Sequence, residues 1–529
     1  MSSVRMSWGD EIAIETVNGI PYRMYTDRPR RIAELLAFTH RWGDRRHIIQ
    51  DDTVLTFEGM RNAVRAKTAQ LLAAGVQPGD KIFLLGWNSP EWVVNFWACL
   101  HARAVPVLAN TWWSTVEIET GLNALSPALT LADAPSAAKL PAGTKTAPWE
   151  IDVAPNLPPE REDEFVDEGD ESDTALIIFT SGTSGTPKAV VLSHRAVLAR
   201  LHMTLHITRK LPQNVNEATQ DVTLLTGPLF HVGTMQALLR AVVVGDTLVL
   251  SAGRYNPADV LKLVERHGVN RWNAVPTMVS RLLDHPDAGK HDLSSLRSIS
   301  IGGAPVHAEL MARIRTELPS VSPRIPTGYG LTENGGQATA AAGSEDLSKL
   351  GSTGRPLPCV EISFLEHEDY PDGEILLRSP TQMSGYFGLA DSPIDKDGWL
   401  HTGDLGRLDE KGNLWITGRC KDMIIRGGEN IAPVAIERAL DHIPGVVECA
   451  VFGVPHADLG EEVMAVVVTE PDAGLTPDDL AAQLKGKVAS FAVPSLWRLQ
   501  HETLPTNHTG KIDKLAIARA IAAETASAQ

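Results

Sequence analysis

Short apolar runs alternate with helical patterns through the N-terminal part of the chain. The run 81–87 (KIFLLGW) predicts a buried strand, residues 89–104 a helix, and the run 105–108 a second strand. Apolar runs of the same kind follow at 175–179, 247–250 and 298–301. Strands separated by helices of this length are typical of βαβ units. The pattern therefore predicts an α/β fold.

The pattern changes after Gly351. Short strands at 374–378 and 414–417, separated by Gly, Asp and Asn turns, indicate a small antiparallel β region. A mixed α/β pattern resumes after Lys421, with helices expected at 432–441 and 477–488 and strands at 446–454 and 462–469. We therefore expect a large N-terminal domain of mixed sheets with flanking helices (residues 1–420) and a small C-terminal α/β domain (residues 421–529).

Length and composition support a globular protein of two or more domains. The chain has 529 residues, whereas a single core rarely grows beyond about 250–300 residues. Hydrophobic residues make up 43% and charged residues 21%, which argues against a disordered chain. The net charge of −17 would repel a phosphate backbone, so we expect no nucleic-acid partner.

The cysteine spacing and the hydropathy of the chain indicate the cellular compartment to expect. The four cysteines are far apart and form no CxxC pair, which excludes a Cys-only zinc site and suggests a reducing compartment. No run approaches the ~18 apolar residues of a membrane span, and the N-terminus lacks the apolar core of a signal peptide. We expect a cytoplasmic protein without a membrane span.

One segment stands out by charge. Residues 160–173 contain nine acidic residues and one arginine. Blocks of like charge repel one another and stay hydrated. The sequence therefore predicts a solvated surface loop here.

A loop rich in glycine and hydroxyl groups directly follows the predicted strand 175–179. Its sequence is TSGTSGTPK, residues 180–188. Glycines let backbone N–H groups approach phosphate oxygens, hydroxyls add donors, and Lys188 adds a positive charge. The spacing differs from that of a Walker loop. A phosphate-binding loop and a flexible surface linker are the two interpretations of these residues alone.

Two shorter motifs could complete a nucleotide site. Residues 329–333 (YGLTE) offer an aromatic ring for a purine, a threonine for a phosphate and a carboxylate for Mg²⁺. Residues 402–404 (TGD) end in an aspartate that could accept from two ribose hydroxyls. Taken singly, such short motifs are common at strand ends.

Two further segments, 418–433 (GRCKDMIIRGGENIAP) and 504–511 (LPTNHTGK), complete a set of five. In this order and spacing the set resembles the acyl-adenylate-forming (AMP-binding) superfamily, which includes acyl-CoA synthetases, carrier-dependent adenylation domains and luciferases. The resemblance extends from about Phe57 to Lys514 and points to the acyl-CoA synthetase branch. It implies ATP, Mg²⁺ and coenzyme A as cofactors or co-substrates.

The resemblance also implies roles for individual residues. Lys511, Thr332 and Glu333 would be catalytic, with Glu333 holding Mg²⁺. The residues implied for ATP and AMP are Thr180, Ser181, Gly182, Thr183, Ser184, Gly185, Lys188, Gly303, Ala304, Pro305, Gly328, Tyr329, Asp404 and Arg419. Those implied for the acid are His231, Gly302, Gly330, Gly335 and Gly336. Gly427, Gly428 and Phe491 would contact CoA.

The implied reaction has two steps. A carboxylate attacks the α-phosphorus of ATP, and a thiol then attacks the acyl-adenylate. Lys511 and Mg²⁺ would offset the repulsion between two anions in the first step. The C-terminal domain would be mobile, with its hinge near Lys421, so that it presents a different face in each step.

The leading interpretation is therefore an acyl-CoA synthetase acting on a small-molecule carboxylic acid. The glycines after Glu333 favour a medium-to-long aliphatic acid or a bulky aryl or ring-bearing acid over acetate. Alternatives are an enzyme that loads a separate carrier protein and a non-catalytic nucleotide-binding relative; a light-emitting oxygenase is more remote. Many relatives are dimers, so the resemblance also suggests a homodimer.

Two departures from the family pattern concern this interpretation. Ala189 follows the loop lysine where many relatives have glycine, and Ala492 replaces a common lysine. The second change removes one expected contact to a CoA phosphate, although Phe491 could still stack on the CoA adenine. For His231, contact with the acid and simple packing are both open.

Overall fold

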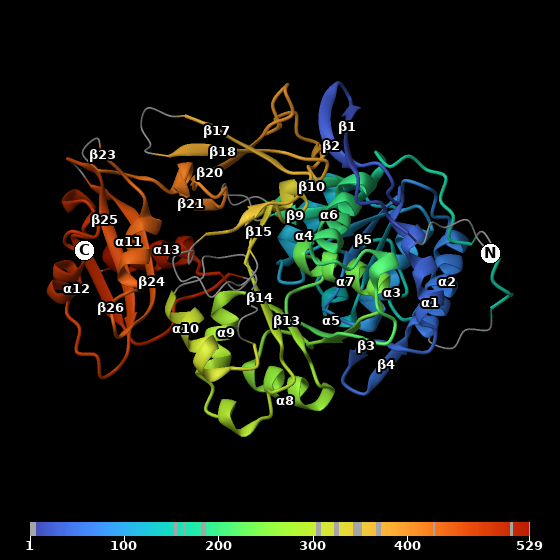
Figure 1. Cartoon of the computed structure of the whole chain (residues 1–529), viewed down its shortest axis with the longest axis horizontal. Coiled ribbons are helices and arrows are strands. Elements are labelled where there is room, and N and C mark those ends of the chain that lie inside the picture. The colour runs from blue at the N-terminus through green and yellow to red at the C-terminus, as the bar shows by residue number, and fades with distance from the viewer. Residues whose placement is uncertain are drawn as a thin grey trace.

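The computed structural model describes residues 7–152, 157–161, 164–180, 187–302, 308–321, 327–341, 352–366, 372–426, 429–456, 458–507 and 511–527. A large N-terminal part carries most of the secondary structure. A smaller C-terminal part lies at one end of the long axis of the molecule (Figure 1). This arrangement confirms the predicted α/β fold class.

The first sheet has seven strands in the order β19-β10-β9-β6-β5-β7-β8. They are β5 (Lys81–Leu85), β6 (Val105–Leu108), β7 (Leu129–Ala132), β8 (Thr146–Ala147), β9 (Thr174–Thr180), β10 (Lys188–Ser193) and β19 (Gly385–Tyr386). Strands β5 to β9 pair in parallel, whereas β10 pairs antiparallel with β9 and β19. The strands predicted at 81–87, 105–108 and 175–179 are confirmed.

The second sheet has six strands in the order β14-β13-β11-β12-β3-β4. They are β3 (Arg46–Gln50), β4 (Thr53–Thr56), β11 (Val222–Leu225), β12 (Thr247–Leu250), β13 (Arg271–Ala274) and β14 (Ser298–Ile301). All neighbours pair in parallel except β3 and β4, which form a hairpin.

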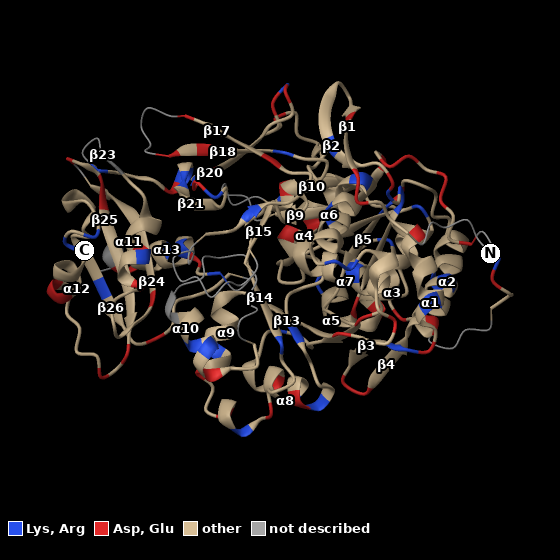
Figure 2. Ribbon diagram, in the orientation of Figure 1, with Lys and Arg blue, Asp and Glu red and all other residues tan. Residues whose placement is uncertain are grey.

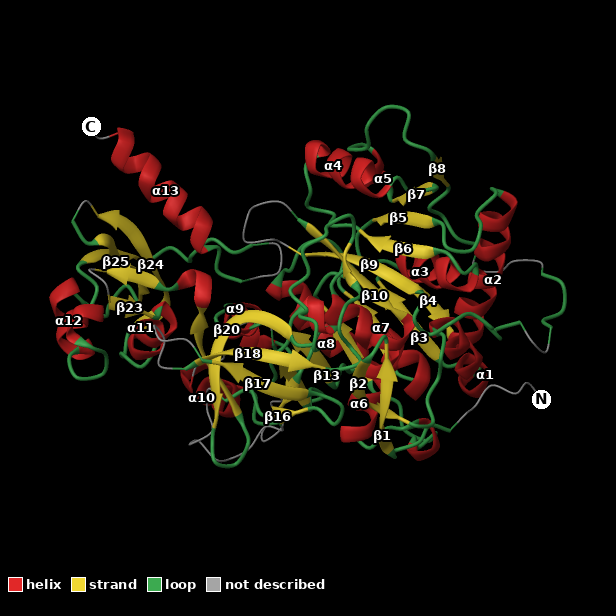
Figure 3. Ribbon diagram, turned by 90° about the horizontal axis from the view of Figure 1, so that it is seen from above, coloured by secondary structure: helices red, strands yellow, loops and turns green. Residues whose placement is uncertain are grey.

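Helices pack on both faces of each sheet (Figure 3). The helices of the N-terminal part are α1 (Thr39–Trp42), α2 (Phe57–Ala73), α3 (Pro90–His101), α4 (Thr115–Leu125), α5 (Ala134–Ala137), α6 (His194–Ile207), α7 (Val232–Val244), α8 (Pro257–His267), α9 (Pro276–Leu283) and α10 (Ala308–Glu317). Helices α3, α6 and α7 share one large core with residues of both sheets. Helix α4 covers the outer face of the first sheet, and α8 to α10 cover that of the second.

This layering explains the continuous apolar runs in the sequence. In β5, Ile82 and Leu84 face the shared core, whereas Phe83 and Leu85 face the cluster under α4. Parallel strands covered on both faces have no solvent side, so they do not alternate polar and apolar residues.

The antiparallel region predicted after Gly351 is a four-stranded sheet in the order β17-β18-β20-β21. Its strands are β17 (Glu361–Leu365), β18 (Gly373–Arg378), β20 (Leu400–Leu408) and β21 (Leu414–Arg419). Two small hairpin-like pairs accompany it, namely β1 (Ile12–Val17) with β2 (Ile20–Tyr25), and β15 (Thr339–Ala340) with β16 (Arg355–Pro356).

The C-terminal part is built on a five-stranded sheet. Its strands are β22 (Ile424–Arg426), β23 (Glu429–Ile431), β24 (Val446–His456), β25 (Gly460–Thr469) and β26 (Leu496–Gln500). Helices α11 (Pro433–Leu440) and α12 (Pro477–Leu484) pack on one face, and α13 (Lys514–Ser527) packs on the other. The predicted elements of this part are confirmed, with α12 ending four residues earlier than expected.

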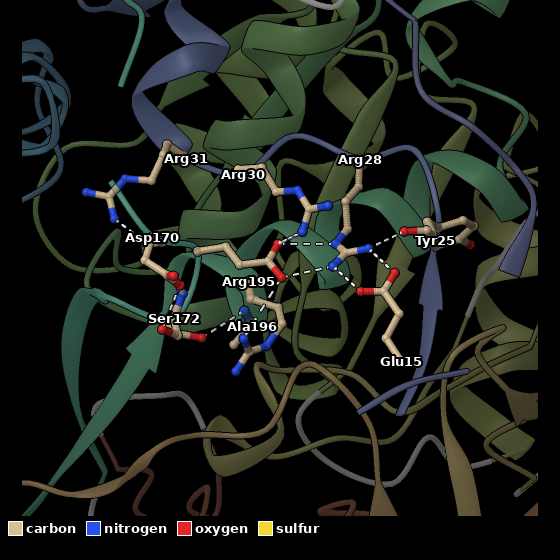
Figure 4. A network of polar contacts seen from close by, with 11 residues as sticks. Glu15, Tyr25, Arg28, Arg30, Arg31, Asp170, Ser172, Arg195 and Ala196 are labelled. Atoms are coloured by element: carbon tan, nitrogen blue, oxygen red, sulfur yellow. Dashed lines mark hydrogen bonds and ion pairs between the residues drawn. The ribbon is translucent and has the colours of Figure 1, made fainter. Parts of the chain in front are cut away.

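The prediction of a solvated surface loop at 160–173 holds for only part of the segment: Glu168, Asp170 and Asp173 are exposed, whereas the side chains of Asp167 and Glu171 are largely buried in ion pairs. Arg31 Nε donates to Asp167 Oδ2 at 2.7 Å, and both side chains are only 4% exposed. Arg28 bridges Glu15 and Glu171, at 2.7 and 2.9 Å (Figure 4). Like charges in sequence do not repel a chain into solvent when arginines from distant segments neutralise them. The acidic segment therefore holds the N-terminal region against the large core.

Acidic and basic residues are otherwise interspersed along the ribbon in the view of Figure 2. None of the described helices combines the length and apolar character that a bilayer crossing requires.

Candidate active site

A cleft of about 1180 Å³ brings together residues from both parts of the chain. Its walls include Thr180, Lys188, His231, Gly302, Gly328, Tyr329, Gly330, Thr332, Glu333, Gly336, Arg419, Lys421 and Lys511, all predicted from the sequence. Ligand pockets commonly measure about 300–1,000 Å³. The cleft is thus large enough for two ligands side by side.

The predicted phosphate loop is closed at its base by two paired strands. Thr180 ends β9, Lys188 begins β10, and these two residues are partners in the antiparallel register. Lys188 Nζ lies 4.6 Å from the ring centroid of Tyr386. Ser181, Gly182, Thr183, Ser184 and Gly185 lie outside the described residues.

Tyr329, Asp404 and Arg419 form one hydrogen-bonded group. The Tyr329 hydroxyl donates to Asp404 Oδ2 at 2.6 Å, and Arg419 Nε donates to Asp404 Oδ1 at 2.6 Å. Asp404 and Arg419 are cross-strand partners of β20 and β21, so the sheet register fixes this pair. The residue Asp404 is only 5% exposed and does not itself line the cleft, whereas its partners Tyr329 and Arg419 do. Ribose hydroxyls would therefore have to share or displace the contacts that Tyr329 and Arg419 make.

The electrostatics of this group are consistent with a neutral phenol and charged partners. Burial, and then the Asp404 charge, raise the pKa of Tyr329 well above its usual value. Burial lowers the pKa of Arg419, but the charge of Asp404 and its hydrogen bond outweigh this and raise it. The phenol can therefore donate a hydrogen bond throughout the physiological pH range.

Glu333 lies in a single 3₁₀ turn, Thr332–Asn334, at the cleft. The Tyr386 hydroxyl donates to Glu333 Oε1 at 2.9 Å, and burial together with this carboxylate raises the pKa of Tyr386. No group of three or more His, Cys, Asp or Glu side chains that could hold a metal occurs in the described ranges. A lone carboxylate fits Mg²⁺, which commonly binds one or two carboxylates together with substrate phosphates.

Lys511 comes from the C-terminal part and reaches the same cleft. Its backbone N–H donates to Asn507 Oδ1 at 3.1 Å. Partial desolvation by the surrounding protein, and then the positive charge of Arg419, lower the pKa of Lys511, and Asp404 opposes the shift. The residue as a whole stays exposed to the wide cleft, so the surrounding protein crowds this amine without enclosing it.

Several predicted site residues are not brought to the cleft or are not described. Gly335 is not in its lining; it has φ +66° and a Cβ there would lie 2.8 Å from the Thr381 carbonyl oxygen. Phe491 belongs to the short 3₁₀ segment Ser490–Ala492 and is 38% exposed. The predicted residues Gly303, Ala304, Pro305, Gly427 and Gly428 lie outside the described part of the chain.

Steric crowding explains why position 330 is occupied by glycine. A Cβ at this position would lie 2.2 Å from the Gly336 carbonyl oxygen, a distance that no side chain tolerates. Gly336 itself lines the cleft and faces Val232, with φ +113°. The prediction that both Gly335 and Gly336 leave volume for the acid is thus supported only for Gly336.

Sequence reasoning missed two features of the cleft. Tyr386 is not among the predicted site residues, yet this tyrosine contacts both Glu333 and Lys188. Sequence reasoning also passed over the stripes of α6 and α7 that line the cleft, Arg200, Leu201, Thr204 and Ile207 on the first and Val232, Gln236, Ala237 and Arg240 on the second. Polar residues at helical spacing were the available signal.

Comparison with known proteins agrees with this geometry. The family model for AMP-binding enzymes matches residues 36–387, and the model for the AMP-binding enzyme C-terminal domain matches residues 435–511. The chain therefore belongs to the AMP-binding enzyme family, on its acyl-CoA synthetase branch.

Among curated relatives, the chain is 34% identical to a 3-[(3aS,4S,7aS)-7a-methyl-1,5-dioxo-octahydro-1H-inden-4-yl]propanoyl:CoA ligase of Mycobacterium tuberculosis, over 89% of this chain and 95% of the relative. It is 33% identical to a feruloyl-CoA synthase of Amycolatopsis, over 88% and 94%. Among solved structures it resembles O-succinylbenzoate coenzyme A synthetase from Bacillus subtilis in complex with ATP and magnesium, with a TM-score of 0.73, 28% identity, and 90% and 98% coverage.

Proposed function

We propose that this chain is an AMP-forming acyl-CoA synthetase that adenylates a bulky or ring-bearing carboxylic acid and transfers the acyl group to CoA. The observation that carries the proposal is the meeting of Lys511 with Thr332 and Glu333 in one cleft, beside the group of Tyr329 and Arg419. These residues come from segments far apart in the chain, so chance would rarely bring them together.

In the first half-reaction the acid carboxylate attacks the α-phosphorus of ATP. Lys188 and the phosphate loop would hold the outer phosphates, while Thr332 donates to the α-phosphate. Lys511 would place its ammonium group between the two approaching anions and so lower their repulsion. Glu333 would hold Mg²⁺, which supplies charge neutralisation for the departing diphosphate. Tyr329 would cover the adenine face, and Asp404 with Arg419 would hold the ribose.

In the second half-reaction a thiol attacks the carbonyl of the acyl-adenylate, and AMP leaves. The proposed boundary between residues 420 and 421 places Lys421 at a hinge, with Lys511 and the glycine turn at Gly427 and Gly428 on the moving side. Rotation about such a hinge would withdraw Lys511 and present the glycine turn to the pantetheine arm.

The assignment of a ring-bearing acid is supported by the names of two relatives and by the volume of the cleft. The M. tuberculosis ligase is named for an indene-propanoyl acid, and another relative, from Bacillus licheniformis, is a 2-succinylbenzoate–CoA ligase at 31% identity. Cleft volume remains for an acid beside ATP. Acetate would leave most of that volume unfilled.

Loading of a carrier protein is the second candidate. It is favoured by Ala492, which lacks the lysine common in relatives, and by 30% identity to a fatty acid–[acyl-carrier-protein] ligase of Streptomyces coeruleorubidus.

Acid-dependent ATP–pyrophosphate exchange tests the first half-reaction, with acetate, octanoate, palmitate, ferulate and ring-bearing propanoates as the panel. We expect exchange, and the highest kcat/KM with a ring-bearing or long acid. Acetate as the best substrate would refute the assignment of the acid, and no exchange with any acid would refute adenylation. Thioester formation with free CoA, or only with a carrier protein, separates the two thiol acceptors.

A further inference from the structure

Arg200 is a buried guanidinium on the cleft wall. It projects from α6 and is 8% exposed. Its Nη1 donates to Thr204 Oγ1 and its Nη2 to Gln337 Oε1. Its Nε has no hydrogen-bond partner among the described residues. An arginine presents five N–H donors in a planar fork, so most of its donor capacity is left over.

The charge of Arg200 is also unopposed. The other arginines that line the cleft have carboxylate partners: Arg240 pairs with Asp246 and Asp221, Arg271 with Asp221, and Arg419 with Asp404. Over the described ranges, no carboxylate forms an ion pair with Arg200, and burial alone lowers its pKa to about 10. A buried cation is costly unless an anion or several acceptors surround it.

A second unsatisfied polar group lies next to Arg200. Gln236 of α7 is 7% exposed and donates through Nε2 to the carbonyl of Val197, which is less than one helical turn before Arg200. Its Oε1 has no partner in the described part of the chain. Arg200 and Gln236 both line the cleft, and each has a buried polar atom without a partner among the described residues. Natural interiors rarely leave such groups unsatisfied without a functional reason.

Arg200 stands apart from the nucleotide contacts. Its two hydrogen-bond partners, Thr204 and Gln337, are not among the residues proposed to hold ATP. Gln337 lies four residues after Glu333 in the sequence and also donates to the carbonyl of Thr339 at 2.9 Å. Arg200 is therefore anchored through Thr204 and Gln337 on the side of the cleft supplied by α6 and α7, with no hydrogen bond to Thr332 or Glu333 among the described residues.

We propose that Arg200 binds a second oxygen acceptor of the acyl substrate, a carboxylate or a carbonyl, at the end remote from the carboxyl group that is adenylated. This proposal rests on the proposed function, because it assumes that the cleft holds an acid. The planar fork of arginine suits a carboxylate in two-point contact, and a ketone would accept from one or two of the same N–H groups. Arg200 would thereby select acids that carry polar groups at both ends.

The test uses acids of one skeleton that differ only at the remote end. The parent is the best acid of the exchange panel, and its three forms carry a methylene, a ketone or a carboxylate there. For the native enzyme we expect kcat/KM for one oxygenated form to exceed that for the methylene form by at least about 30-fold, mainly through KM, because a site built for a polar group rejects its apolar analogue. The better of the two oxygenated forms identifies the group.

Arg200→Met should bring this ratio close to one while keeping exchange with the methylene acid. Arg195→Met is the matched control, since Arg195 lies on the same helix but contacts Glu171 outside the cleft. It should keep the native ratio. Arg200→Met removes a buried charge without an ion pair but also the hydrogen bonds to Thr204 and Gln337, so the two stability effects oppose each other and its melting temperature is measured beside that of Arg195→Met.

The proposal is overturned if the native enzyme uses the methylene acid as efficiently as both oxygenated acids. It is also overturned if Arg200→Met keeps the native ratio of kcat/KM between the oxygenated and the methylene acid. If that variant does not fold, Arg200→Lys keeps the charge but loses the fork, and its KM for the oxygenated acid should rise with kcat little changed; an unchanged KM overturns the proposal. No exchange with any acid refutes the proposed adenylation itself, which distinguishes that failure from a failure of Arg200.

Discussion

The hydroxyl of Tyr329 donates a 2.6 Å hydrogen bond to the carboxylate of Asp404, 75 positions later in the chain. Tyr329 lies in the segment between α10 and β15, whereas Asp404 lies in β20 of the antiparallel sheet. The bond therefore joins two separately built regions at the cleft. Because Arg419 binds the other oxygen of the same carboxylate, Asp404 organises both of its neighbours.

Removal of Asp404 should weaken ATP binding more than removal of the Tyr329 hydroxyl. Tyr329→Phe removes one of the two hydrogen bonds that orient Asp404 but also removes a competitor for its carboxylate, so KM for ATP should change by less than about tenfold. Asp404→Ala leaves both Tyr329 and Arg419 without their acceptor and should raise KM at least about a hundredfold. Steady-state exchange measures both. Tyr22→Phe, in β2 outside the cleft, is the control, and native KM values in both variants would exclude Asp404 from the nucleotide site.

Loss of the Glu333 charge should abolish most adenylation. Glu333→Gln keeps the shape that accepts from Tyr386 but loses the charge for Mg²⁺, so we expect exchange to fall at least about a hundredfold and to recover in part at high Mg²⁺. Asp391→Asn is the control, because Asp391 also lines the cleft but has no assigned role. Native activity of Glu333→Gln at low Mg²⁺ would contradict the proposed metal site.

The two buried arginine partners of the acidic segment should matter for stability. Arg31→Met removes the buried partner of Asp167 and leaves only the half-exposed Arg103, 3.2 Å from the other carboxylate oxygen, so the loss should lie near the lower end of the about 3–5 kcal/mol that breaking a buried pair costs. Arg266→Met is the control: it removes an ion pair with Asp52, whose side chain is 95% exposed, and should cost at most about 1 kcal/mol. Urea unfolding measures both, and equal stability losses would show that burial of the pair is unimportant.

The same network predicts a loss of stability in acid. The Arg28 hydrogen bond lowers the pKa of Glu15, and Arg28 with Arg30 outweighs the effect of burial to lower the pKa of Glu171. A carboxyl with a lowered pKa in the folded state stabilises the fold above its usual value of 4.5 and loses that stabilisation as pH falls through the lowered pKa. The free energy of unfolding should thus drop below about pH 4.5, and less so in Arg28→Met.

Strands and helices that depend on the local pattern of apolar residues could be predicted from the sequence. Strands such as 105–108, 247–250 and 298–301 have the predicted bounds, because burial on both faces gives an unbroken apolar run. The acidic segment was partly misjudged because its partners, such as Arg28 and Arg31, lie more than a hundred residues earlier in the chain. Local charge density cannot reveal such long-range pairing.

Only those site residues that lie in recognisable motifs could be predicted from the sequence. Tyr329, Glu333 and Asp404 were found through short motifs, whereas Arg200 lies in an ordinary amphipathic helix with no motif around it. Its unopposed charge becomes visible only when α6, α7 and the segment of Gln337 are placed in space. Residues that would select the acid are therefore harder to read from sequence than those that would bind ATP.

The lowered pKa of Lys511 predicts the alkaline limit of the first half-reaction. Only the protonated amine opposes the charge of two anions, so kcat/KM for ATP should fall at a pH below the usual lysine value of 10.5. Lys511→Arg stays protonated, so any residual exchange should lose this alkaline limb. An alkaline limb that is identical in both enzymes would assign it to another group.

Lys511 and Gly428 should affect opposite half-reactions if the C-terminal part alternates between two positions. An interaction made in one transition state alters only that step. Lys511→Ala should abolish acid-dependent pyrophosphate exchange but largely keep thioester formation from supplied acyl-adenylate and CoA. Gly428→Leu should keep exchange and lose thioester formation, because a side chain would obstruct the pantetheine path. If both residues only support turns of the C-terminal part, each change should depress both half-reactions and the melting temperature together. Parallel loss in both variants would refute alternation about Lys421.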